Sequence, residues 1–132
     1  MKKYLLPLFF ITMLSFSSCE EENIVNDSIV GEWEMKSATN GMTGASTDFP
    51  HGNGSIMKFT ESNYEIITNW QLTRSGLYSI VKETSNLDKK IYNRIVYDNE
   101  TNSIRSFFKV ENNLLYIWID GNDGPSVVYR RK

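Results

Sequence analysis

The sequence contains one cysteine, one histidine and only three prolines among its 132 residues. A lone cysteine, Cys19, excludes an internal disulfide and a zinc site built from cysteines, so stability must come from a packed core. A lone histidine, His51, leaves no histidine pair for a metal and no recognisable catalytic triad. The composition therefore favours a binding or interaction protein over an enzyme, with no cofactor and no metal. An active site remains open only if polar groups converge inside the fold.

Oxygen ligands do gather near the carboxyl end, at Asp120, Asn122 and Asp123. Their spacing does not match the calcium loop of an EF-hand, and a tight turn between strands uses the same residue types. We therefore expect a turn at this position rather than a calcium site.

The chain also lacks a basic excess, since 16 acidic side chains face 14 basic ones for a net charge of −2. A nucleic-acid-binding protein shows a concentrated basic face. We expect no nucleic-acid partner.

The amino terminus holds the longest apolar run. Lys2 and Lys3 precede an almost uninterrupted apolar stretch over residues 4–16, which is shorter than the roughly 20 residues that span a bilayer. Small residues then lead into Cys19, as at a secretory cleavage site. Residues 1–18 are therefore predicted to be a signal peptide.

Residues 14–19 read Leu-Ser-Phe-Ser-Ser-Cys and resemble a bacterial lipobox, with Phe16 where the pattern prefers an aliphatic residue. The resemblance implies cleavage before Cys19 and attachment of acyl chains such as palmitate to Cys19, so that lipid holds the protein at a membrane. An ordinary secreted protein with a stray cysteine and an uncleaved anchor are the alternatives.

The next ten residues, 19–28, read as an acylated cysteine followed by an acidic tether. Glu20, Glu21 and Glu22 resemble the acidic signal that sends some lipoproteins to the outer face of the bacterial outer membrane, although a solvated spacer fits equally. Asp27-Ser28-Ile29 resembles a bacterial O-glycosylation acceptor, which would place a glycan on Ser28.

From Ile29 onward the apolar residues recur with period 2, which indicates half-buried β-strands. No segment shows a helical stripe, and the connections are too short to cross between parallel strands. We predict an all-β fold, an antiparallel up-and-down β-barrel of about eight strands, because closure removes exposed sheet edges. A sandwich is the competing solution. The predicted strands cover residues 30–37, 56–60, 64–71, 76–80, 91–97, 104–110, 114–119 and 127–131.

Two motifs mark the ends of this region. Gly31-Glu32-Trp33 resembles the Gly-x-Trp opening of lipocalin-like proteins, and Tyr129-Arg130-Arg131 resembles their last strand. The resemblance covers residues 29–132 and implies a lipocalin-like barrel that is closed where an arginine packs across the first-strand tryptophan. Residues Gly31, Trp33, Tyr129 and Arg131 are the candidates, with Arg130 facing solvent. A full lipocalin has a further helix after the barrel, so we expect a shallow cavity here.

An eight-stranded barrel either fills with its own side chains or holds one small ligand. The preferred hypothesis is a surface-anchored module that binds a small, mainly hydrophobic ligand at the end away from Trp33. Aromatic residues with a polar tip suit such a mouth. The ligand-contact candidates are Tyr64, Trp70, Tyr78 and Phe108. By analogy with lipocalins, residues 38–54 would form a loop over the entrance, carrying Phe49 and His51.

The rival hypothesis is a filled barrel that acts as an interaction module, either an inhibitor or an accessory subunit of a surface complex. Its partner would contact an exposed patch of outward residues. That patch comprises Ile67, Tyr92, Phe107, Tyr116 and Trp118. Glu32 and Glu34 are expected on the solvated face.

Overall fold

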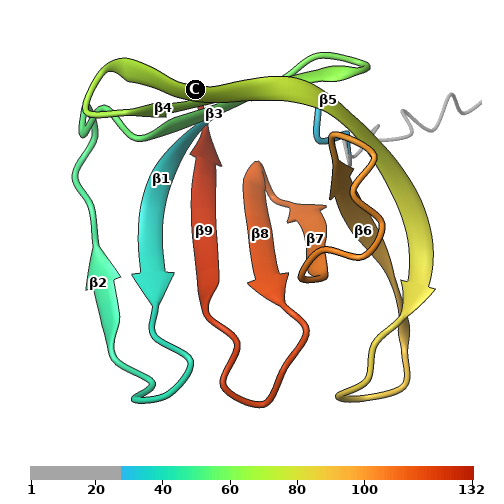
Figure 1. Ribbon diagram of the computed structural model, residues 1–132. Helices are drawn as coiled ribbons and strands as arrows, with labels where there is room; N and C mark the ends of the chain where they lie inside the picture. The colour runs from blue at the N-terminus through green and yellow to red at the C-terminus, as the bar shows by residue number, and fades with distance from the viewer. Residues whose placement is uncertain (1–27) are drawn as a thin grey trace, which may run out of the picture.

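The computed structural model describes residues 28–132, and this part of the chain contains nine β-strands without a helix (Figure 1). The predicted signal peptide, the acylation of Cys19 and most of the tether lie outside the described residues. Within them, no helix is long and apolar enough to cross a membrane. The strands are β1 (Gly31–Thr39), β2 (Ser46–Asp48), β3 (Ile56–Phe59), β4 (Asn63–Thr68), β5 (Gln71–Thr84), β6 (Ile91–Tyr97), β7 (Ser106–Glu111), β8 (Leu114–Ile119) and β9 (Ser126–Arg131).

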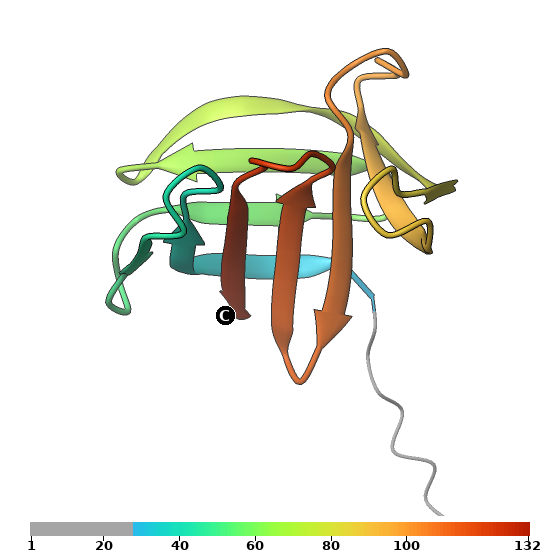
Figure 2. The same ribbon diagram turned by 90° about the horizontal axis from the view of Figure 1, so that it is seen from below.

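Eight of these strands close into an antiparallel barrel in the order β1-β3-β4-β5-β6-β7-β8-β9, with β9 paired back to β1. The predicted all-β, up-and-down barrel is confirmed, and it is consistent with a lipocalin-like barrel. β2 is a short addition that pairs with the end of β1 outside the closed ring. Strands β1, β3 and β4 run across β7, β8 and β9, so the barrel is flattened into two crossed layers (Figure 2).

Alternation along the strands places one row of side chains inside the barrel. Trp33, Tyr64 and Leu115 are almost completely buried there. The buried cluster contains Ile29, Trp33, Met57, Phe59, Tyr64, Tyr78, Ile95, Phe108, Val110, Leu115 and Tyr129. At roughly 1.5 to 3 kcal/mol for each fully buried large apolar side chain, this cluster is the main source of stability.

The first and last strands meet at Trp33 and Arg131, which are paired neighbours. The Arg131 guanidinium lies 4.1 Å from the centre of the Trp33 ring, and it donates hydrogen bonds to the carbonyl oxygens of Val30 and Ser28. Gly31 sits beside this contact with φ of 140°, and a Cβ there would lie 2.7 Å from Arg131 Nη1. The structure thus places the four residues of the two terminal motifs at or next to the β1–β9 seam.

One hairpin differs from the expectation. The sequence suggested a strand through residue 71 with Trp70 facing inward, but β4 ends at Thr68 and the chain turns at Asn69 and Trp70. These two residues have φ of 51° and 65°, as a type I′ hairpin turn requires. Trp70 therefore stands at the tip, with 62% of its surface exposed.

Candidate functional site

The four predicted ligand contacts do not line one cavity. Tyr64, Tyr78 and Phe108 belong to the buried cluster, whereas Trp70 lies outside the barrel. The Tyr78 ring packs edge-on against Phe59, and its hydroxyl donates a 2.5 Å hydrogen bond to the carbonyl oxygen of Thr60. Tyr78 thus packs into the interior near the β3–β4 turn, and the open interior space lies toward the other end of these two strands.

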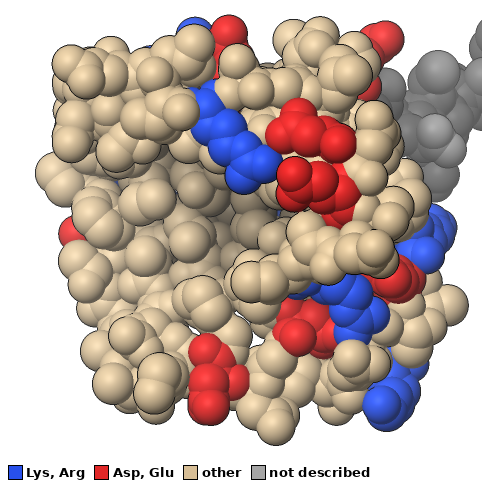
Figure 3. All heavy atoms as spheres, in the orientation of Figure 1, with Lys and Arg blue, Asp and Glu red and all other residues tan. Residues whose placement is uncertain are grey.

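That space lies where β3 begins and β4 ends. A cavity of about 110 Å³ opens there, bordered on the inside by Met35, Met57, Ile66 and Tyr129. Figure 3 shows a hollow on the face drawn, with basic and acidic side chains along part of its edge. The cavity bordered by Met35 and Ile66 is smaller than a cavity of about 150 Å³ that admits benzene, and far smaller than a drug-sized pocket. It suits a small group or the end of a chain.

Arg74 reaches the same side of the barrel. It is paired with Ile66, which borders the cavity, and it belongs to the inward row that continues through Gly76 and Tyr78. Its guanidinium lies 5.6 Å from the ring centres of both Tyr64 and Tyr97, and its side chain is half exposed. The Arg74 cation therefore lies beside two aromatic rings on the inner side of β5.

Asp98 fixes this arrangement. Its carboxylate accepts hydrogen bonds from the Tyr64 hydroxyl at 2.7 Å, from Arg74 Nη2 at 3.1 Å and from the Leu77 backbone N–H at 3.1 Å. The hydrogen bond from Tyr64, followed by those from Arg74 and Leu77, lowers the pKa of Asp98 despite partial burial. Gly76 makes room for it, because any Cβ there would overlap the carboxylate.

Three tyrosines lie in this region, Tyr64 and Tyr97 beside Arg74 and Tyr129 on the cavity wall. Tyr64 and Tyr97 pack edge-on with ring centres 4.7 Å apart. Burial raises the pKa of Tyr97 and raises that of Tyr129 to about 12, while burial and then Asp98 raise that of Tyr64. All three remain protonated near neutral pH. The cavity wall is thus mainly apolar, and the polar cluster around Arg74 adjoins it only through the Ile66–Arg74 pair.

Sequence reasoning missed Arg74 and Asp98. Extending the predicted inward row Gly76–Tyr78–Ile80 backward by two residues reaches Arg74, so the signal was present in the period-2 pattern. Asp98 follows β6 and carried no such signal. Asp98 lies in the turn after β6, and its own backbone φ there is 52°.

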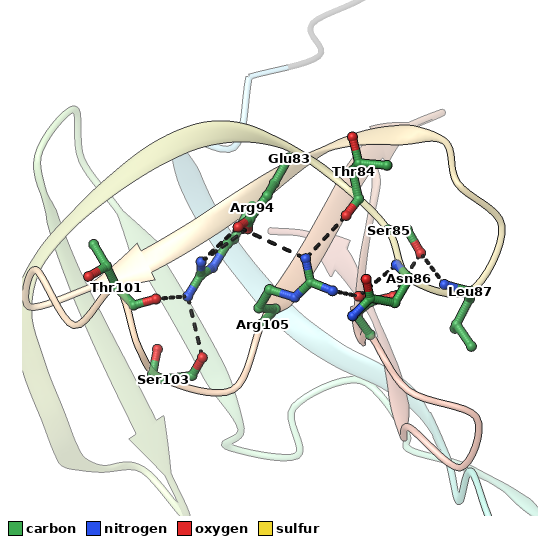
Figure 4. A network of polar contacts seen from close by, with 10 residues as sticks. Glu83, Thr84, Ser85, Asn86, Leu87, Arg94, Thr101, Ser103 and Arg105 are labelled. Carbon is green, nitrogen blue, oxygen red and sulfur yellow. Dashed lines mark hydrogen bonds and ion pairs between the residues drawn. The ribbon is translucent and has the colours of Figure 1, made fainter.

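A second polar network lies outside the barrel and ties loops together (Figure 4). The Asp120 side chain is fully buried, contacts Arg105, and accepts hydrogen bonds from the Ser85 hydroxyl at 2.7 Å and the Asn86 N–H at 3.0 Å. Burial alone would raise the pKa of Asp120, but these hydrogen bonds and the Arg105 charge lower it. Glu83 continues the network to the buried Arg94.

This network shows what Asp120 of the acidic turn contacts. Asp120 is already occupied by protein donors, and residues 28–132 contain no group of three or more His, Cys, Asp or Glu side chains placed to hold a metal ion.

Glu34 corrects another expectation. It faces outward as expected, yet it is 3% exposed because the segment after β2 covers it. Its carboxylate accepts hydrogen bonds from the Gly52 N–H at 2.8 Å and Arg130 Nε at 2.9 Å, and His51 lies 3.5 Å away. Arg130, expected to face solvent, also donates to the carbonyl oxygen of Phe49. Phe49 and His51 thus cover the outer wall beside Glu34.

The predicted outer aromatic patch is also partly covered. Phe107 is fully buried although it faces outward. Tyr92 and Trp118, both half-buried, pack against it and against each other, with ring centres 5.1 Å apart for the last pair. Much of this aromatic surface is therefore buried by contacts among Tyr92, Phe107 and Trp118.

Comparison with protein-family models, with curated proteins and with solved structures found no match for this chain.

Proposed function

We propose that this protein is a membrane-anchored lipoprotein whose barrel binds a small, mainly hydrophobic ligand. The observation that supports ligand binding is the incompletely filled interior, where a cavity of about 110 Å³ is bordered by Met35, Met57, Ile66 and Tyr129. The interior near the β3–β4 turn is packed around Phe59 and Tyr78. Binding would rest on shape and desolvation, with each buried methylene contributing about 0.8 kcal/mol.

Titration with 1-octanol, followed by NMR of the side-chain methyl groups, tests this proposal. We expect saturable shifts at Met35, Met57 and Ile66, and none at Ile29, which precedes β1 and lies toward the opposite end of β3 from the cavity. Ile66→Phe should fill the cavity and weaken binding, while the matched change Ile104→Phe, on a side chain that is 76% exposed, should leave it unchanged. Shifts that do not saturate, or that spread evenly over the surface, would contradict ligand binding.

The anchor is proposed from residues 14–19 and needs its own test. The full chain, produced in a bacterial host, should yield a mature protein that begins at Cys19, carries acyl mass and sediments with membranes. Cys19→Ala should abolish both the acyl mass and the sedimentation. A mature wild-type protein of purely peptide mass would contradict the lipoprotein proposal.

An interaction module is the second candidate. Leu72, Leu77 and Val81 are 58%, 52% and 42% exposed on the outer side of β5, and exposed apolar groups of this kind favour a protein partner. Changing Leu77 and Val81 to Ser should then abolish partner capture at unchanged stability. Capture that survives this change would contradict the second candidate.

A further inference from the structure

A pocket of about 270 Å³ opens on the outer wall of the barrel, where the β4–β5 turn lies beside the last residues of β9. Trp70 borders this pocket from the turn, and Arg131 and Lys132 border it from the end of β9 and just beyond. The pocket has more than twice the volume of the interior cavity and shares no lining residue with it. It is therefore a separate site, outside the space proposed for a hydrophobic ligand.

Trp70 is held in an exposed position against the preference of its backbone. Its φ of 65° is one that glycine adopts freely and a bulky residue does not. Its N–H donates a 3.1 Å hydrogen bond to the Gly54 carbonyl oxygen, and a Cβ at Gly54 would lie 2.8 Å from Cδ1 and Nε1 of the ring. The ring is thus fixed against the neighbouring loop while 62% of the residue stays exposed. Backbone strain of this kind gathers at functional positions, so it points to a binding role for the exposed ring.

The charges around Trp70 are mostly positive. Of the described acidic side chains, only Glu34 borders the pocket, and it is already paired with Arg130 at 2.9 Å. Arg131 and Lys132 form no ion pair with an acidic side chain among residues 28–132. The Lys132 ammonium lies 5.9 Å from the ring centre of Trp70. The pocket therefore joins a flat aromatic surface to two positive charges that no acidic side chain in this range balances.

We propose that this pocket binds an acidic saccharide, with one sugar ring against Trp70 and its anionic group beside Arg131 and Lys132. One face of a pyranose ring presents C–H groups, whose hydrogens carry partial positive charge and are attracted to the negative face of an indole. The two cations select an anionic sugar over a neutral one, because a guanidinium and an ammonium both bind carboxylates. Binding here is independent of the ligand proposed for the barrel interior.

The polar groups of the lining favour a saccharide over a nucleotide, which also combines a flat ring with an anionic group. A sugar hydroxyl can donate a hydrogen bond to the Glu34 carboxylate and can bond the imidazole of His51, whose side chain is 83% exposed. An ionised phosphate has no proton to offer Glu34. The net charge of −2 also disfavours nucleic acid as a partner.

The test compares trigalacturonate with its methyl ester, which share their sugar rings but differ in charge, by calorimetric titration of the full chain. Trigalacturonate should bind more tightly, and the difference should shrink at higher salt because Lys132 is exposed. NMR of the indole N–H groups should show the largest shift at Trp70 and none at Trp33, which is fully buried.

Three substitutions separate stacking from charge. Trp70→Gly should weaken binding of both saccharides by about tenfold or more, because the stacking surface is lost while Asn-Gly preserves the turn. Trp70→Phe should retain part of both affinities. Lys132→Met should weaken trigalacturonate binding about threefold and change binding of the ester by less than about 1.5-fold. The matched control is Lys82→Met, at an exposed lysine on β5 that does not border the pocket, and it should leave both affinities unchanged.

Equal affinities for trigalacturonate and its ester would overturn the acidic class of the ligand. An affinity that is unchanged in Trp70→Gly, with folding of the variant verified by its urea midpoint, would overturn the site. Tighter binding of AMP than of trigalacturonate, with the same loss in Trp70→Gly, would show a nucleotide site and overturn the saccharide proposal. No measurable binding of trigalacturonate would overturn the proposal outright, whether or not 1-octanol binds in the interior.

Discussion

At the scale of single residues, a few side chains determine how the ends of the barrel are built. Trp33 and Arg131 close the seam between β1 and β9, and Asp98 joins Tyr64 to Arg74 inside the barrel. Most inward residues could be predicted, because alternation depends only on neighbours in the chain, but Trp70 was wrongly predicted to face inward. The burial of Glu34 could not, because it depends on a segment almost twenty residues away that folds back over the outer wall.

Gly31→Ala should destabilise the fold by about 1 to 3 kcal/mol, since a residue with a Cβ is strained at this positive φ and the new carbon would push Arg131 off Trp33. Urea denaturation measures the change. Gly121→Ala is the matched control, because a Cβ at that position would have no other atom within 4 Å, and it should cost less than about 0.5 kcal/mol. Equal costs at both positions would contradict the packing described at the seam.

Glu34 should make the free energy of unfolding depend on pH in the acidic range. Burial alone would raise the pKa of Glu34, but the Gly52 N–H and Arg130 lower it below the ordinary value of 4.5. A lowered pKa in the folded state gives stability that is complete above pH 4.5 and is lost as the pH falls through the folded value. Glu34→Gln, compared with wild type by thermal unfolding from pH 7 to pH 2, should show a shallower loss below pH 4.5. An identical pH profile would exclude this contribution.

At the scale of elements, hairpin turns and loop contacts decide which surfaces are open. The sequence located most strands well, but it missed the β4–β5 turn, because Asn69-Trp70 lacks the glycine that usually marks a type I′ turn. It also missed β2, whose three exposed residues show no apolar alternation. The outer loops were unpredictable for a similar reason, since they are held by single polar side chains such as Asp120.

Trp70→Gly should raise the free energy of unfolding by up to about 1 kcal/mol, because Asn-Gly adopts this turn without the strain of a bulky residue at φ of 65°. It should leave 1-octanol affinity unchanged, because Trp70 lies outside the barrel. Chemical denaturation and calorimetry measure the two quantities. A clear loss of affinity would return Trp70 to the ligand site.

Asp120→Asn should destabilise the protein by about 2 to 4 kcal/mol, because it leaves the Arg105 contact uncompensated in a buried position. Hydrogen exchange should accelerate first at Asn86 and Leu87, whose loop Asp120 and Ser85 hold. Asp123→Asn, at an exposed site in the same turn, should change stability by less than about 0.5 kcal/mol. Similar effects of the two substitutions would contradict the conclusion that Asp120 holds this loop in place.

At the scale of the whole molecule, eight strands close into a barrel that is packed at one end and incompletely filled at the other. The closed barrel was predictable, because period-2 strands with short connections leave few other ways to remove sheet edges. The location of the open space was not predictable from the chain, because it depends on which inward side chains meet. Tyr78 and Phe108 pack into the core, whereas Met35 and Ile66 border the open space.

Native mass spectrometry of the protein gently released from its producing cells tests whether the barrel holds a ligand. We expect a folded species heavier than the denatured chain by one discrete mass, which is lost on denaturation and reduced in Ile66→Phe but not in Ile104→Phe. Identical native and denatured masses, together with no uptake of added 1-octanol, would contradict ligand binding and would point to a filled barrel that works through its outer surface.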